Sequence, residues 1–114
     1  MSIAVTATKN ALAAAYGGLG NWISLHNSDP GTTGTGEATG GTPAYARKAT
    51  AWGSSVNGVV TGSQVAIDAA AGTYTFAGIW SAVTGGTFVD KIAISSTTLG
   101  AQGQVQVTPS YTQT

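Results

Sequence analysis

Few side chains in this sequence could do chemistry, and the single histidine is the first of them. His26 lies in the segment SLHNSDPG, close to Ser28 and Asp29. A Ser–His–acid triad would have to use these residues, but the segment lacks the Gly-x-Ser-x-Gly turn that exposes a serine nucleophile. We instead expect His26 to end a strand and to hydrogen-bond to the backbone of the following loop.

The four acidic residues form no metal-binding or hydrolytic pattern. They stand far apart, at positions 29, 37, 68 and 90. Calcium loops place several oxygen ligands at close spacing, and a glycosidase needs two carboxylates about 5–10 Å apart. Asp29 precedes Pro30 and Gly31, which is typical of a carboxylate that caps a turn, with a structural cation at Asp29 or Asp90 as the alternative.

The chain has no cysteine, so a thiolate ligand, a cysteine nucleophile and a disulfide are all excluded. With one histidine and four dispersed acids, no constellation for catalysis remains. We therefore predict no catalytic, cofactor-binding or metal site, and a protein that is not an enzyme.

Arg47 and Lys48 are the only adjacent basic residues. We expect a salt bridge to a carboxylate or a solvated strand face here, with a phosphate or sugar contact as the alternative. The glycine-rich stretches that precede them lack the Lys-Ser/Thr pair of a phosphate-binding loop.

Aromatic side chains are the remaining candidates for binding. Trp22, Trp52 and Trp80 would serve as core residues, as anchors of a protein interface, or as platforms for a sugar ring. The side chains that we predict to contribute to an interface are Trp22, Tyr45, Trp52, Ile79 and Trp80.

Charge is scarce in the whole chain. Charged residues make up 7% of the 114 residues and the net charge is zero, against about 25% charged residues in a typical soluble domain. A neutral chain lacks the basic patch that binds nucleic acid. No apolar run approaches the roughly 20 residues of a membrane helix, and the first residues do not resemble a secretion signal. Because charge keeps soluble proteins apart, its scarcity indicates a surface that is partly covered.

The first element that must position these residues is a short N-terminal helix. Thr8 or Asn10 would cap it, Ala11–Ala15 are strong helix formers, and Gly17-Gly18 would end it. Helical spacing predicts a buried stripe made of Leu12, Ala15, Tyr16 and Leu19.

Short alternating segments then predict six or seven strands, at residues 21–26, 44–52, 59–61, 64–68, 73–82, 87–95 and 104–108. Residues 27–43 form a long exposed loop of the kind that carries function or contacts, and Asn57-Gly58 is a favoured tight turn. The segment 73–82 is apolar on both faces, so we expect it to be central or covered by another subunit. In the segment 87–95, alternation places Phe88, Ile92 and Ile94 inward and Val89, Lys91 and Ala93 outward.

These elements predict a mainly β chain that forms one domain over residues 1–114. One sheet must bury its apolar face against another, so we expect a small antiparallel β-sandwich or barrel with one short N-terminal helix.

Three segments in order resemble a known family: WISLHNSDPG (22–31), GGTPAYARK (40–48) and GTYTFAGIWSAVTGGTF (72–88). Together they resemble small virion proteins of tailed phages, common in phages of actinobacteria and labelled tail fibre, minor tail or head-associated proteins. The resemblance spans residues 10–95. It implies a location in the virion, on the tail or the capsid surface, and no catalytic residue.

The resemblance and the composition together predict a structural component of a bacteriophage virion, a minor tail or tail-fibre-associated protein that acts by protein–protein contact. Its partners would be other copies of itself and other virion proteins, with no nucleic acid and no membrane. One alternative is a capsid decoration protein. The other is a carbohydrate-binding adhesion module that contacts a host-surface glycan through Trp22, Trp52 or Tyr45.

Overall fold

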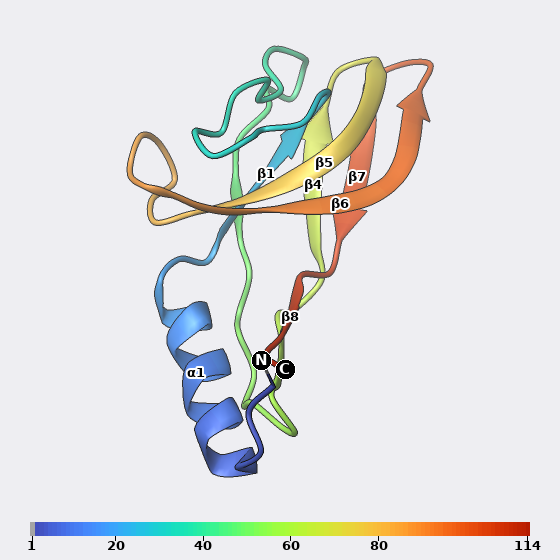
Figure 1. Cartoon of the computed structure of the whole chain (residues 1–114). Coiled ribbons are helices and arrows are strands. Elements are labelled where there is room, and N and C mark those ends of the chain that lie inside the picture. The colour runs from blue at the N-terminus through green and yellow to red at the C-terminus, as the bar shows by residue number, and fades with distance from the viewer. Residues whose placement is uncertain (1) are drawn as a thin grey trace.

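The computed structural model describes residues 2–114, which form a broad head and a narrow stalk within a shape of 47 × 25 × 23 Å (Figure 1). The head comprises residues 20–49 and 63–107, and the stalk comprises the N-terminal helix with residues 50–62 and 108–114. In chain order the elements are α1 (Thr6–Gly18), β1 (Trp22–His26), β2 (Lys48–Ala49), β3 (Val59–Thr61), β4 (Val65–Ala69), β5 (Gly72–Trp80), β6 (Phe88–Leu99), β7 (Gly103–Val107) and β8 (Ser110–Thr112).

The head is built on a four-stranded antiparallel sheet in the order β2-β1-β5-β6. β5 pairs with β1 on one side and with β6 on the other, so the strand that is apolar on both faces is central, as predicted. The register places Leu25 opposite Ala77 and Trp22 opposite Trp80.

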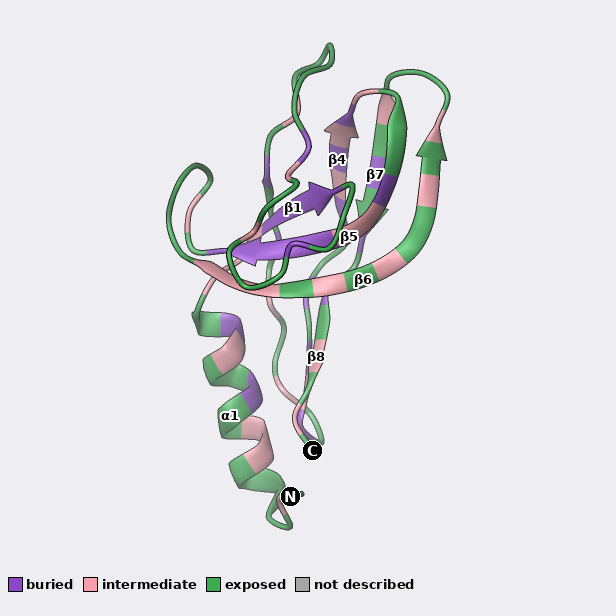
Figure 2. Cartoon of the chain, turned by 45° about the horizontal axis from the view of Figure 1, so that its top comes forward, coloured by how far each residue is buried: buried purple, intermediate pink, exposed green. Residues whose placement is uncertain are grey.

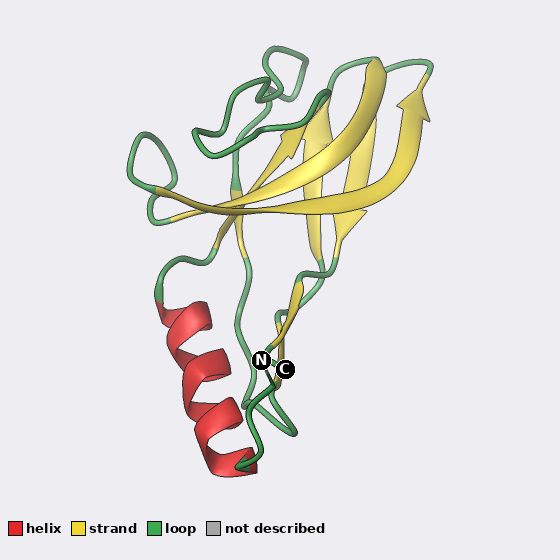
Figure 3. Ribbon diagram, in the orientation of Figure 1, coloured by secondary structure: helices red, strands yellow, loops and turns green. Residues whose placement is uncertain are grey.

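A second layer, the antiparallel pair β4–β7, covers one face of this sheet. The core between the layers contains Ile23 and Leu25 from β1, Ile79 from β5 and Ile67 from β4, all fully buried. Each such side chain contributes about 1.5–3 kcal/mol through removal from water. The predicted fold class is confirmed: the chain is mainly β, with antiparallel sheets and one N-terminal helix (Figure 3).

The helix begins earlier than predicted. α1 starts at Thr6, and its N-cap is Val5, whose carbonyl accepts hydrogen bonds from the amides of Thr8 and Lys9. Neither Thr8 nor Asn10 acts as a cap. Asn10 instead lies inside the helix and its side chain accepts a hydrogen bond from the Gly58 amide at 2.8 Å, which ties α1 to the turn of the stalk.

The predicted buried stripe of α1 holds at Tyr16, which is half-buried and packs against the core, and is wrong at its other three positions. The fully covered residues are Ala13 and Gly17, whereas Leu12 is 44% exposed, Leu19 is 61% exposed and Ala15 is exposed. The helix packs its small residues inward because Trp52 lies against it: a Cβ at position 17 would come within 3.1 Å of the Trp52 ring. Figure 2 shows this narrow buried strip along an otherwise exposed α1.

The segment 44–52 was expected to be one strand, but only Lys48–Ala49 is. The residues before it are held out of the sheet because the side chains of Tyr45 and Arg47 bond to Glu37. Glu37 itself lies in the loop 27–43, which folds back over the sheet: its residue Ala38 is buried, and the Ala38 amide donates to the Leu25 carbonyl.

β6 runs four residues beyond its predicted end, and its alternation changes near its start. Asp90 pairs with Ile79 and Phe88 pairs with Trp80, so Val89 is an extra residue in β6. The bulge turns Phe88 toward Trp80 and away from the core, whereas Val89 and Ile92 pack on the core. The inward placement predicted for Phe88 and the outward placement predicted for Val89 are therefore wrong, whereas the inward placements of Ile92 and Ile94 are confirmed.

The stalk pairs β3 with β8, a strand that the sequence did not predict. Pro109 ends β7, as expected, and the chain resumes pairing directly after it. At the tip, Asn57 and Gly58 both have positive φ angles, 51° and 79°, which confirms the tight turn predicted there.

Candidate functional site

On the face of the main sheet away from the core, four residues form a buried chain of hydrogen bonds. The Trp80 indole donates to Ser24 Oγ at 2.9 Å, and Ser24 Oγ lies 2.7 Å from His26 Nε2. His26 Nδ1 lies 2.8 Å from the Thr35 carbonyl oxygen. Because a carbonyl only accepts, Nδ1 carries the proton, and Nε2 then accepts from the serine hydroxyl.

This chain anchors the loop and is not a catalytic dyad. Ser24 and His26 are both fully buried, so no substrate reaches them. Burial lowers the pKa of His26, which keeps the ring neutral and the direction of the hydrogen bonds fixed. The predicted role of His26, a histidine at a strand end that bonds to loop backbone, is confirmed.

A second polar cluster holds the loop 27–43 from its other side. Arg47 forms a bidentate pair with Glu37, with Nε to Oε2 and Nη2 to Oε1 both at 2.9 Å. The Tyr45 hydroxyl donates to Glu37 Oε2 at 2.6 Å and accepts from the Leu25 amide. Burial acts to raise the pKa of Glu37, but the hydrogen bonds from Arg47 and Tyr45 outweigh it and lower that pKa.

Arg47 also joins two further parts of the head. Its Nη1 donates to the carbonyls of Ala82 and Gly85, both at 2.9 Å. Its guanidinium carbon lies 3.7 Å from the centre of the Trp80 ring, in a cation–π contact. The salt bridge that we predicted as one use of Arg47 is therefore present, and Lys48 is the exposed neighbour.

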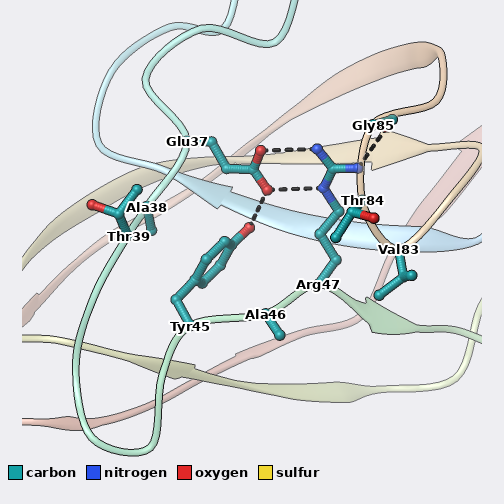
Figure 4. A pocket seen from close by; sticks show the side chains of 9 residues that line it. All are labelled: Glu37, Ala38, Thr39, Tyr45, Ala46, Arg47, Val83, Thr84 and Gly85. Carbon is teal, nitrogen blue, oxygen red and sulfur yellow. Dashed lines mark hydrogen bonds and ion pairs between the residues drawn. The ribbon is translucent and has the colours of Figure 1, made fainter.

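A pocket of about 310 Å³ lies beside this cluster (Figure 4). Three short segments line it, and its lining residues are Glu37, Ala38, Thr39, Tyr45, Ala46, Arg47, Val83, Thr84 and Gly85. In Figure 4, Glu37 and Arg47 face each other across one side of this pocket and Tyr45 reaches Glu37 from below.

Aromatic contacts hold the stalk together, and a hydrogen bond from Tyr16 ties it to the head. The Tyr16 ring of α1 stacks on Tyr111 of β8 at 3.8 Å, and Trp52 meets it edge-on. The Tyr16 hydroxyl donates to Asp90 of β6 at 2.7 Å, and burial together with this bond raises the pKa of Tyr16. The inner side of the stalk is thus well packed.

The outer side of the stalk presents apolar side chains to solvent. Val5, Leu12 and Leu19 of the helical segment are 58%, 44% and 61% exposed, and Val56 at the stalk tip is 62% exposed. We call these four residues the apolar stalk surface. The sequence did not indicate that Leu12 and Leu19 are exposed, because their spacing is also that of a buried helix stripe.

The five predicted interface residues are divided between surface and interior. Trp22, Tyr45 and Trp52 are half-buried, and the Trp52 indole donates to the Gly20 carbonyl at 2.9 Å. Ile79 is fully buried and Trp80 is 9% exposed. Ile79 is covered by the core between the two layers, and Trp80 is covered by Arg47 and Phe88, so they leave little side-chain surface for a partner.

The charged residues elsewhere have structural roles. Asp29 accepts from the Gly31 amide at 2.8 Å, which confirms the predicted turn capping, and it also pairs with Lys91 at 2.7 Å on the exposed surface. Within residues 2–114, no group of three or more histidine or acidic side chains could hold a metal ion. Over the same residues, α1 is too short to cross a membrane.

Comparison with known families decides what kind of protein this is. Residues 6–111 match the family model described as podophage GP4 fiber I protein gp80. The match covers both the head and the stalk. The chain belongs to this family. The podophage fibre family is a family of phage structural proteins, so the expectation of a phage virion protein is confirmed at this level. A search of curated proteins gave no match to the chain.

Proposed function

We propose that this chain is a single structural domain of a phage tail fibre, acting by protein–protein contact and not by chemistry. The observation that carries the proposal is the match of residues 6–111 to the podophage fibre family. Its partners are other copies of itself and neighbouring proteins of the tail.

The surface of the chain supports a role in assembly. Four large aliphatic side chains are exposed on the stalk, whereas the core of the head is closed. Exposed large apolar side chains gathered on one part of a molecule are typical of surfaces that bind another protein, and we propose this role for the stalk. Electrostatic repulsion between copies is weak, because only 8 of the 114 residues are charged. Four of them are basic and four are acidic, so the net charge is zero.

The contacts of the polar side chains argue against catalysis. The one serine that contacts the histidine is buried with it, and the Glu37 carboxylate is engaged by Arg47 and Tyr45. These groups hold the loop in place and have no free nucleophile or general base among them.

Locating the protein on intact particles tests this proposal. We expect gold-labelled antibodies against the chain to mark the tail in electron micrographs, with a copy number in mass spectrometry far below that of the major capsid protein. Labelling spread over the head, with a copy number that follows the capsid protein, would instead establish the alternative of capsid decoration. Absence from purified particles would refute both.

A further inference from the structure

We propose that the pocket beside the Glu37–Arg47 pair binds one uncharged polyhydroxylated ring, such as a neutral sugar unit. This function goes beyond assembly and does not depend on where the chain lies in the particle. The pocket lies on the outer side of the Glu37–Arg47–Tyr45 cluster. The inner side of the same cluster anchors the loop 27–43.

The dimensions of the pocket fit a small ligand. Its volume of about 310 Å³ lies at the lower end of the roughly 300–1,000 Å³ that is usual for ligand sites. The lining comes from three separate segments, residues 37–39, 45–47 and 83–85, which Arg47 ties together through Glu37, Ala82 and Gly85. The site is therefore formed before the ligand arrives, which limits the ordering cost of binding.

The polar groups offer both kinds of hydrogen bond. A guanidinium has five N–H donors and a carboxylate has about four acceptor positions. Arg47 uses four donors within residues 2–114, and Glu37 accepts three bonds. One donor on Arg47 and about one acceptor position on Glu37 therefore remain for a ligand. A sugar hydroxyl both donates and accepts, so it matches such an adjacent pair.

Charge and apolar contact narrow the ligand class. Glu37 and Arg47 neutralise each other, and no other charged side chain lines the pocket. The site has no net charge with which to compensate the desolvation of an anionic or cationic ligand. Ala46, Val83 and the Tyr45 ring supply apolar surface, against which the C–H face of a sugar ring packs.

The structure also makes the tryptophans less suitable as sugar platforms than the sequence suggested. Trp80 lies beneath Arg47 and is buried. Trp52 is fixed edge-on against Tyr16, with its indole bonded to Gly20. Of the three residues expected to contact a glycan, Tyr45 lines this pocket, whereas Trp22 and Trp52 do not.

Saturation-transfer NMR on the full chain tests the proposal, with glucose, galactose, mannose and N-acetylglucosamine as probes and with glucuronate and glucosamine as charged counterparts. We expect transfer to at least one neutral sugar and less to its charged counterpart. Ala46 is exposed at the pocket, so Ala46→Trp should fill the site without removing a core contact and weaken binding by at least about tenfold.

Two further variants make the result decisive. Ala101→Trp places the same ring in the exposed β6–β7 turn, outside the pocket lining, and should leave binding unchanged. Thr84→Val removes a lining hydroxyl at nearly constant volume and should weaken binding even if Ala46→Trp fails to fold. The proposal is overturned if no neutral sugar shows transfer, if charged sugars bind more strongly, or if Ala46→Trp and Thr84→Val bind as well as the wild type.

Discussion

The head and the stalk of this protein bury opposite kinds of residue. In the head, large aliphatic side chains fill the core, and buried polar groups such as Ser24 and His26 are hydrogen-bonded. In the stalk, the helix turns Ala13 and Gly17 inward and leaves Leu12 and Leu19 exposed. The core of the head is therefore closed, whereas the stalk keeps large aliphatic side chains exposed, and we propose that another molecule covers them.

The largest expected effect is in the head core. Ile79→Ala should lower the free energy of unfolding by about 4 kcal/mol, because the fully buried side chain leaves a cavity between the two layers. The matched change in the stalk, Leu19→Ala, should cost less than about 0.5 kcal/mol because Leu19 is mostly exposed. Urea denaturation of both variants measures the difference, and equal losses would show that the stalk helix is part of the core.

The next largest effect concerns the cluster that holds the loop 27–43. Arg47→Met should cost about 3 kcal/mol, because it leaves the half-buried Glu37 without its bidentate partner. Lys48→Met removes the same charge from the neighbouring exposed position and should be nearly neutral. Thermal or urea unfolding gives both values, and a nearly neutral Arg47→Met would mean that the cluster does not stabilise the head.

The buried histidine predicts a smaller, pH-dependent effect. Burial lowers the pKa of His26 in the folded chain, whereas the unfolded chain takes up a proton near the usual value of about 6.5. As the pH falls through this range, the unfolded state binds more protons, so stability decreases. We expect the urea midpoint to fall between about pH 7.5 and about pH 5.5, and to stay level over this range in His26→Gln. A level wild-type curve would contradict a neutral buried ring.

Much of the head could be predicted from the sequence because its signals are local. The alternation in β5 specifies its own structure, as does the Asn57-Gly58 turn at the tip of the stalk. The cluster at Glu37 could not be found in this way, since it joins residues 37, 45 and 47 to the backbone of residues 82–85 across a long loop. The bulge at Val89 depends on pairing with β5, and it reversed the expected direction of Phe88.

The stalk was less predictable because its packing depends on two residues distant from the helix, Trp52 and Tyr111. Helical spacing pointed to Leu12 and Leu19 as the buried side of α1. The adjacent side is covered instead, because Trp52 lies against Gly17 and Tyr16 stacks on Tyr111. Strand β8 was missed since it follows Pro109 directly and is only three residues long.

The most direct test of the account is the association of the stalk. Sedimentation equilibrium over a range of concentrations should show that the wild-type chain self-associates. The double variant Leu12→Gln/Leu19→Gln should weaken that association while keeping the helix, and Val83→Gln, which changes an exposed aliphatic residue of the head, should not. A wild-type chain that stays monomeric throughout, or equal association of all three proteins, would contradict the assignment of the apolar stalk surface as the assembly contact.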